Sequence, residues 1–366
     1  MSLMSNDPHQ AAGPVFEFGV YTLGDIVPDR ATGRAATPKQ RMDEIVAAAR
    51  LADEAGLDVF GVGEHHRLDF AVSSVPVVLA AISQVTRRIR LTSATTVLST
   101  ADPVRVFEDF ATLDLLSGGR AEIISGRGAF LESFPLFGYQ RDDYRQLFEE
   151  NLRLLSELNE REIVTWSGQF RSPLQEAEIA PRPLQPRLPL WVGVGGTPET
   201  AAFAGEIGAG LAIAILSGQP ERFAGLADAY RKAGADAGLA PDSLKIGITS
   251  HAYLAPTAGQ ALDEFYPYYC GYLGAFDEIS GGARLGRDEF ESYLQPGNAL
   301  SVGGPDEIVE KIMYQHEQFG HRRFMAQMDI GGVPFDKVAA SIELLATEVA
   351  PRVRRLLAAK DNGGQA

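Results

Sequence analysis

The stretch RRIRLTSATTVLSTADPVRVFEDFATLDLLSGGRAEIISGRG, residues 87–128, holds two β-rich apolar runs separated by a segment of helical period. The first run is IRLTSATTVL, the second is RAEIIS, and Asp102-Pro103 opens the helical segment between them. Aspartate suits the position before a helix, and proline suits its first turn. The order strand, helix, strand predicts a βαβ unit with parallel strands.

The same alternation continues on both sides of this stretch. Strand-like runs begin near residues 15, 57, 89, 120, 188, 210, 244 and 322, and each is followed by at least one helical segment. Eight βα units in one chain of 366 residues predict an α/β fold, a single closed (β/α)8 TIM barrel that spans residues 14–355. A doubly wound open sheet is the alternative, because the pattern alone does not show closure.

Four segments fall outside this alternation. We expect residues 1–13 and 356–366 to be disordered tails. Two long excursions, the proline-rich 160–187 and the tyrosine-rich 257–300, are expected to form lids or walls at the C-terminal mouth of the barrel. The second either lines a substrate pocket or packs against the barrel or a second subunit, and packing is favoured for its aromatic residues Phe265, Tyr266, Tyr268, Tyr269, Tyr272 and Phe276.

The composition argues against several classes of function. A net charge of −15 disfavours nucleic acid and anionic membranes as partners. The single cysteine, Cys270, excludes an internal disulfide and a cysteine-rich zinc site, and we assign it no role. No apolar run is long enough to span a membrane, and the first residues lack the apolar centre of a signal peptide. We therefore expect a cytoplasmic protein.

The ends of the predicted strands are the places to look for chemistry, because barrel enzymes carry their active sites there. Glu64, His65 and His66 follow the second strand. Successive strand residues point to opposite faces, so these three cannot all bind one ion, and no metal site is predicted. The residue types leave two readings open for the histidines: one ring packs at the rim, or one ring transfers protons.

A glycine turn and two arginines predict an anion site. VGVGGTPET, residues 192–200, is a strand, a turn and a helix opened by Thr197 and Pro198, where free amides and the helix dipole attract a phosphate. Arg127 lies between two glycines at the end of the fourth strand, and Arg145 begins the next helix. A dinucleotide fingerprint would need a glycine where Pro198 stands. The alternative is a glycine-rich loop with no ligand.

The motifs, read in order, resemble the luciferase-like flavin monooxygenases. They are ARLADEAGLDVFGVGEHH, the stretch 87–128, FGYQRDDYRQLFEENLRLL, PLWVGVGGTPETAAFAGEIGAG and SVGGPDEIVEKI. Each is a weak signal alone, but they follow the family's order over nearly the whole chain. The resemblance implies a (β/α)8 barrel with FMN bound at the strand ends.

The resemblance also assigns the phosphate contacts. Arg127 and Arg145 match arginines that hold the FMN phosphate, and Gly195 and Gly196 match the family's backbone phosphate turn. The turn lacks the side-chain hydroxyl that some members carry there. This departure does not remove flavin binding.

Other positions match the surroundings of the flavin ring. His65 matches the histidine implicated in acid–base chemistry, and we expect it to face the flavin while a neighbour braces the turn. Ala94-Thr95 matches a position where many members have a non-prolyl cis peptide beneath the ring. Gly126 stands where luciferase has a reactive cysteine, so we expect a monooxygenase that is not a luciferase.

The function implied by the resemblance is the oxygenase part of a two-component system. Such an enzyme takes reduced FMN from a separate flavin reductase and uses O2 to oxidise a small organic substrate. A deazaflavin-dependent hydride-transfer enzyme is the alternative, and a non-catalytic flavin-binding protein is a third reading. We expect a homodimer, and the sequence does not identify the substrate.

Overall fold

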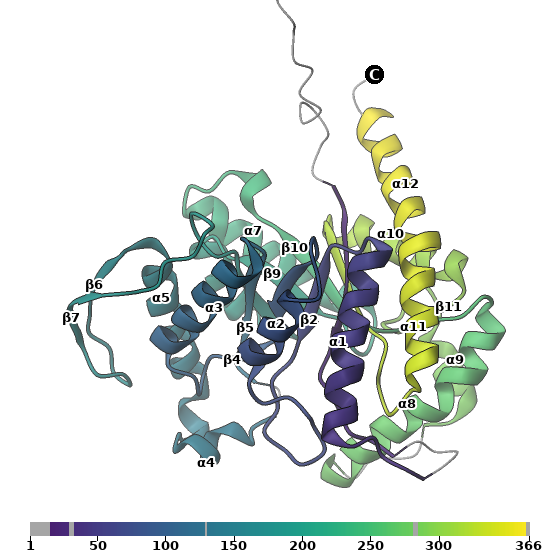
Figure 1. The fold of residues 1–366 in the computed structure, drawn as a ribbon. Helices are drawn as coiled ribbons and strands as arrows, with labels where there is room; N and C mark the ends of the chain where they lie inside the picture. The colour runs from purple at the N-terminus through teal and green to yellow at the C-terminus, as the bar shows by residue number, and fades with distance from the viewer. Residues whose placement is uncertain (1–14, 29–32, 129, 281–284, 364–366) are drawn as a thin grey trace, which may run out of the picture.

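Eight parallel strands form a closed ring in the computed structural model of the chain, which describes residues 15–28, 33–128, 130–280 and 285–363 (Figure 1). β10 pairs with both β9 and β12, and β12 pairs with β1, so the ring has no open edge among the described residues. The predicted barrel is confirmed and the open sheet is excluded. In ring order the strands are β1 (Glu17–Thr22), β2 (Val59–Val62), β3 (Arg90–Ser93), β5 (Ala121–Gly126), β8 (Leu190–Val194), β9 (Gly210–Ala214), β10 (Ile246–Leu254) and β12 (Arg323–Gln327).

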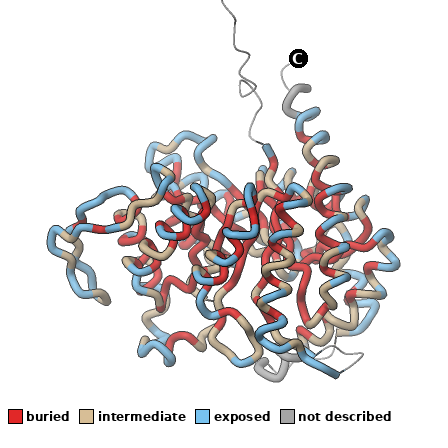
Figure 2. The backbone as a smooth tube through the Cα atoms, in the orientation of Figure 1, coloured by how far each residue is buried: buried red, intermediate tan, exposed pale blue. Residues whose placement is uncertain are grey.

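Helices cover the outside of the ring and turn their buried faces toward it (Figure 2). One helix follows each strand: α1 (Pro38–Ala55), α2 (Val75–Ser83), α3 (Pro103–Ser117), α5 (Tyr144–Glu160), α6 (Pro198–Glu206), α7 (Ala224–Asp236), α10 (Pro305–Phe319) and α11 (Phe335–Leu344). Short 3-10 turns precede α5, α7 and β10, at Arg141–Asp143, Pro220–Phe223 and Pro241–Ser243.

Helix α1 shows how local sequence sets these boundaries. Thr37 accepts a hydrogen bond from the amide of Gln40, and the Gln40 side chain accepts one from the Thr37 amide. This capping box fixes the first turn. Gly56 ends the helix with a φ of 88°, a conformation that glycine adopts readily. Ile45, Ala49 and Ala52 lie on the face that packs into the core.

The proline-rich segment 160–187 does not form a wall of the mouth. It joins the end of α5 to the start of β8, so it leaves and re-enters the barrel at the opposite, N-terminal face. β6 (Ile163–Trp166) and β7 (Leu174–Glu178) pair as a hairpin outside α5, where the Glu150 carboxylate accepts the amides of residues 169–171. The expected position is wrong because the segment follows a helix and not a strand.

The aromatic segment 257–300 follows β10 and lies at the mouth, as predicted (Figure 1). It forms α8 (Ala258–Ser280) and α9 (Arg287–Tyr293), and β11 (Ser301–Gly303) then pairs with β10.

Most of the described aromatic side chains of this segment pack internally. Phe265 and Tyr269 of α8 are buried, and their ring centroids lie 6.5 and 5.6 Å from that of Phe290 on α9. The favoured reading of packing is confirmed for these residues. Tyr272 differs, because it reaches the cavity described below. The side chain of Phe276 lies outside the described residues.

The C-terminal tail is helical. A π-helical turn (Leu345–Val349) continues α11 into α12 (Ala350–Gly363). Arg354 of α12 donates to the Phe16 carbonyl and pairs with Asp58 at 2.6 Å, which ties the helix to the base of the barrel. The expectation that 356–366 is disordered is therefore wrong as far as residue 363. Residues 1–13 and 364–366 lie outside the described residues.

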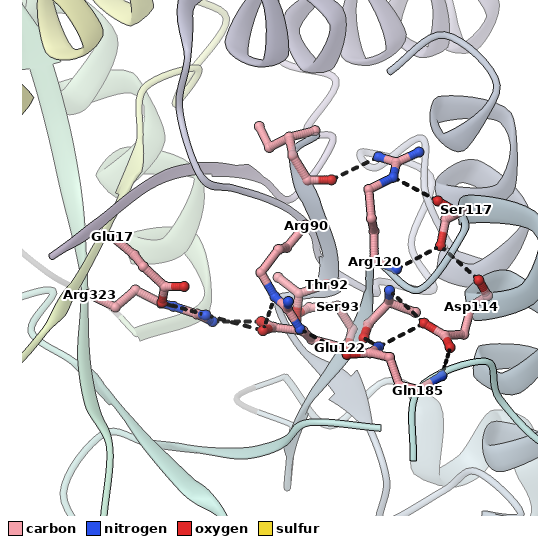
Figure 3. Close-up of polar contacts among 12 residues, drawn as sticks. Glu17, Arg90, Thr92, Ser93, Asp114, Ser117, Arg120, Glu122, Gln185 and Arg323 are labelled. Atoms are coloured by element: carbon pink, nitrogen blue, oxygen red, sulfur yellow. Dashed lines mark hydrogen bonds and ion pairs between the residues drawn. The ribbon is translucent and has the colours of Figure 1, made fainter. Parts of the chain in front are cut away.

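An ion network centred on a buried glutamate lies at the N-terminal end of the barrel (Figure 3). Glu122 of β5 is 2 % exposed, and its carboxylate accepts hydrogen bonds from Arg90 and Arg323. Arg323 also pairs with Glu17 and lies 4.2 Å from the centroid of the Trp191 ring. Burial alone would raise the pKa of Glu122, but the two arginines outweigh burial and hold that pKa below its ordinary value.

Glu122→Ala is expected to lower the free energy of unfolding by about 3–5 kcal/mol, because it takes the buried carboxylate away from the buried guanidinium of Arg323 and the partly buried one of Arg90. Urea unfolding measures this loss. Glu160→Ala is the control, since its carboxylate pairs with Arg187 on the surface at 3.1 Å. Its loss should stay below about 1 kcal/mol. Equal losses in the two variants would contradict the account of the network.

The buried side chain of His321 is expected to make the folded protein less stable in acid. Its side chain is fully buried, and burial, followed by the nearby His316, lowers the pKa from 6.5 to about 3. Below pH 6.5 His321 therefore takes up a proton in the unfolded chain but stays neutral in the folded one. Its contribution to the free energy of unfolding is complete above pH 6.5 and is lost as the pH falls toward 3. His321→Leu should flatten this loss by up to about 1.4 kcal/mol per pH unit. Urea unfolding at a series of pH values tests it, and identical slopes in both proteins would refute it.

Candidate active site

A cavity of about 700 Å³ opens at the C-terminal ends of the strands, on the side of the barrel where α4 (Ser133–Phe137) and α8 are labelled (Figure 1). All eight strands, or the loops that follow them, contribute residues to its wall. The volume lies within the range of cofactor and small-molecule sites. The cavity therefore occupies the position where a barrel enzyme carries its chemistry.

The turn Glu64-His65-His66 forms part of the cavity wall. The Glu64 carboxylate accepts the amide of Val97 in β4 (Thr96–Val97) at 2.9 Å and lies 2.9 Å from Nε2 of His66. These bonds tie the turn to the next strand. Glu64 and His66 thus brace the turn that presents His65.

His65 is held by a carboxylate and two aromatic rings. Its Nδ1 lies 3.0 Å from Oε1 of Glu132, its ring stacks on Phe70 at 4.0 Å, and the Phe130 ring meets it edge-on. A carboxylate only accepts, so Nδ1 carries the hydrogen and Nε2 of the neutral ring carries a lone pair. Burial lowers the pKa of His65 below 6.5, although Glu132 acts in the opposite direction. The ring is therefore neutral at pH 7 and able to accept a proton.

The floor of the cavity is built from backbone and small side chains. The peptide bond between Ala94 and Thr95 is cis, which confirms the prediction for this position. A Cβ on Gly126 would lie 2.7 Å from Oγ1 of Thr95, and one on Gly193 would lie 3.0 Å from its Cγ2. A side chain at Gly126 would therefore press against Thr95. A planar group can approach such a floor closely.

One end of the cavity is suited to an anion. Arg127 donates to the hydroxyls of Tyr144 at 3.1 Å and Thr197 at 2.6 Å. Gly195 and Gly196 form the turn before α6, and a Cβ on either would meet nothing within 4 Å, so their backbone borders open space. The Thr197 side chain makes no capping bond to α6, whose positive end therefore faces this space. We refer to Arg127, Gly195 and Gly196 as the anion cradle.

Residues 16–322 match the family model of the luciferase-like monooxygenases. The chain belongs to this family. The predicted resemblance is thereby confirmed. One homologue is named a flavin-dependent monooxygenase and another a monooxygenase, and this luciferase-like protein is an enzyme of the oxidoreductase class.

Two relatives show the range of cofactors in the luciferase-like family. The oxygenase component of a flavin-dependent trigonelline monooxygenase from Acinetobacter baylyi is 24 % identical over 339 residues, which cover 86 % of this chain and 91 % of the relative. An F420-dependent glucose-6-phosphate dehydrogenase from Amycolatopsis mediterranei is 30 % identical over 179 residues, which cover 46 % of this chain and 52 % of that protein.

Solved structures share the luciferase-like barrel. The monooxygenase RslO1 from Streptomyces bottropensis has a TM-score of 0.80 at 25 % identity, covering 92 % of this chain and 99 % of its own. The oxygenating constituent of 3,6-diketocamphane monooxygenase from Pseudomonas putida, solved in complex with FMN, has a TM-score of 0.75 at 18 % identity, covering 93 % and 99 %.

Arg145, the second arginine expected at the phosphate, does not line the cavity of this luciferase-like protein. Its side chain is half exposed, and its Nε donates to Glu149 of the same helix at 2.8 Å. Adjacent helical residues point about 100° apart, and Tyr144 is the one that turns toward Arg127. The hydroxyls of Tyr144 and Thr197 therefore stand beside Arg127 in place of a second guanidinium.

Three further residues of the luciferase-like site were not singled out from the sequence. Glu132, which holds His65, lies in a stretch without a motif. Tyr144 precedes Arg145 in the run RDDYRQ, in which the arginine was predicted to be the phosphate contact. Tyr21 of β1 lines the cavity, and the inward alternation of that strand could have indicated it.

Among the residues described, no three His, Cys, Asp or Glu side chains are grouped so that they could hold a metal ion. In the same part of the chain, every helix is too short or too polar to cross a membrane.

Proposed function

We propose that this chain is the oxygenase component of a two-component FMN-dependent monooxygenase. It takes reduced FMN from a separate reductase and uses O2 to oxidise a small organic substrate. The observation that carries the proposal is the anion cradle at one end of a cavity that also contains the Ala94-Thr95 floor and His65. The relative named as the oxygenase component of a flavin-dependent monooxygenase supports it.

The residues present fit FMN. A single guanidinium, two exposed glycines and one helix N-terminus suit one phosphate monoester. The flat floor suits a fused planar ring, and glycines on two neighbouring strands keep it flat. Arg127, Gly195 and Gly196 would hold the phosphate, and Ala94 and Thr95 would support the ring.

When bound, reduced FMN supplies the electron pair for the reaction of O2 with the substrate. The chain's own residues bind, orient and exchange protons. The anion cradle fixes one end of the cofactor. Nε2 of His65 accepts or returns a proton at the cavity wall, while Glu132 holds the opposite nitrogen in place. Phe70 stacks on one face of the imidazole and Phe130 meets it edge-on, and these contacts hold the ring in its orientation.

The alternative is an F420-dependent hydride-transfer enzyme, which the F420-dependent glucose-6-phosphate dehydrogenase relative supports. Anaerobic titration of cofactors distinguishes the two functions. Oxidised FMN, reduced FMN and F420 are titrated into the purified protein, and binding is followed by flavin fluorescence and equilibrium dialysis. The proposal predicts that reduced FMN binds and that F420 does not displace it. Tight F420 binding that excludes FMN would favour hydride transfer.

A second assay tests the two-component arrangement. The protein, FMN, NADH and O2 should give no turnover until a flavin reductase is added. Trigonelline and diketocamphane, the compounds in the relatives' names, are the first substrates to try, followed by a panel of small ketones, amides and heterocycles. Turnover with NADH and no reductase would contradict the arrangement.

A further inference from the structure

Three polar side chains stand side by side in the cavity. In the paired registers, Gln327 of β12 is the partner of both Tyr21 of β1 and His251 of β10. Side chains at paired positions of neighbouring strands project from the same face of a sheet, and all three line the cavity. We refer to Tyr21, Gln327 and His251 as the polar wall.

The polar wall lies across the cavity from the anion cradle. The cradle is at the ends of β5 and β8, the fourth and fifth strands of the ring, whereas the wall is on the seventh, eighth and first. A group bound at the wall therefore leaves the cradle available.

Two members of the polar wall have buried polar atoms without a hydrogen-bond partner in the described part of the chain. These atoms are both ring nitrogens of His251, which is 4 % exposed, and Nε2 of Gln327, which is 1 % exposed. The Tyr21 hydroxyl differs, because it hydrogen-bonds to Thr249. Buried polar groups in native proteins are nearly always bonded, so unpartnered ones on a cavity wall indicate contacts kept for a ligand.

The polar wall carries no charge of its own at neutral pH. Burial lowers the pKa of His251 to about 4, so its ring is neutral and offers one donor and one acceptor. The carboxylates that act on Tyr21 and on Tyr272 above it are Asp25 and Asp329, and both are paired with the buried guanidinium of Arg41, which does not line the cavity. An anionic group would find no cation at this wall to compensate it.

Aromatic rings cover the polar wall. Tyr269 and Tyr272 of α8 meet the His251 ring edge-on at 5.8 and 5.5 Å. Of these two rings only Tyr272 lines the cavity, so a molecule at the wall meets hydrogen-bonding groups and, beside them, the Tyr272 ring.

We propose that the polar wall binds the carbonyl or amide oxygen of an uncharged substrate, with Gln327 Nε2 and the His251 ring as donors. The assignment of the bound molecule as the substrate rests on the proposed function. The wall selects neutral molecules with a hydrogen-bond acceptor over anions, which lack a counter-charge, and over cations that have only donors. The apolar remainder of the substrate packs against Tyr272.

Stability and binding should respond in opposite directions to changes in the polar wall. Gln327→Leu and His251→Phe keep roughly the same volume and remove the unpartnered atoms. Their melting temperatures should equal or exceed that of the parent protein, because an unpartnered buried polar group is unfavourable. A purely structural role for either side chain predicts a lower melting temperature.

The binding test uses three probes of one shape: benzamide, benzoate and benzamidinium. Ligand-observed NMR titrations on the protein saturated with FMN measure each Kd. Benzamide should bind at least about tenfold more tightly than the other two, and each wall variant should lose about tenfold in benzamide affinity. Gln315→Leu on α10 is the matched control. Gln315 is fully buried with both amide atoms unpartnered, but it lies outside the cavity, so benzamide affinity should not change.

Several outcomes would overturn the proposal. Tighter binding of benzoate or benzamidinium than of benzamide would show that charge and not hydrogen bonding governs the wall, and would refute the proposal. Wall variants that weaken FMN as much as Arg127→Ala would make the wall a cofactor contact. If FMN fails to bind the parent protein, the proposed function fails by itself. The benzamide series is then measured in the FMN-free protein, where the same ranking and losses still decide the wall.

Discussion

His65→Ala is expected to lower the rate of substrate oxidation by about 10²–10⁴-fold, the contribution of a well-placed acid–base group. The ring lies on the cavity wall with Nδ1 bonded to Glu132, so its Nε2 is the atom that exchanges a proton. FMN affinity should stay unchanged, since His65 is not part of the anion cradle. Less of the O2 consumed should appear in product and more as hydrogen peroxide. The assay follows O2, peroxide and product together, with a substrate found in the screen above.

The pH profile gives His65 a signature that loss of packing would not reproduce. The parent enzyme should show an inflection below pH 6.5, where the lowered pKa of His65 places its titration. His65→Ala should lack this inflection. Glu132→Gln should move it to lower pH, because the carboxylate raises the His65 pKa. Unchanged coupling between O2 and product in His65→Ala would return this residue to a packing role at the rim.

Arg127→Ala is expected to weaken FMN binding by one to two orders of magnitude. A hydrogen bond to a charged group contributes about 1.5–3 kcal/mol, and each 1.4 kcal/mol is about tenfold in Kd. Arg127 is the one arginine among the residues that line the described cavity. Fluorescence titration of FMN measures the loss, and riboflavin, which lacks the phosphate, should bind parent and variant alike.

Arg145→Ala is the matched control for Arg127→Ala. It removes the same side chain 18 residues further on, from a position where the guanidinium bonds to Glu149 outside the cavity. FMN affinity should change by less than about threefold. Equal FMN affinity in the parent protein and Arg127→Ala would show that the cradle is not the phosphate site.

Much of the fold could be predicted because its signals are local. The capping box at Thr37 and Gln40 and the glycine after α1 are adjacent in sequence to the boundaries that they set. The segment 160–187 was misplaced because its position depends on which face of the barrel the preceding helix reaches. The part of the C-terminal helix beyond residue 355 was expected to be disordered, because Leu357 is buried only against the assembled barrel.

The residues of the site likewise fall into those that could be predicted from the sequence and those that only the assembled barrel brings together. Strand-end position suggested His65, Arg127 and the Gly195-Gly196 turn, and the structure brings all of them to one cavity. Glu132 is 67 residues from His65, so its role arises only when the barrel closes. Likewise, the register that aligns Gln327 with His251 is a property of the assembled ring.

Labelling with the heavy isotope of oxygen tests the central claim, FMN-dependent monooxygenation, most directly. The protein is loaded anaerobically with reduced FMN and substrate, mixed with labelled O2, and the product is analysed by mass spectrometry. A monooxygenase transfers one oxygen atom of O2 to product and the other to water. The account therefore predicts one labelled oxygen atom in each product molecule. Unlabelled product, or product formed without O2, would contradict it.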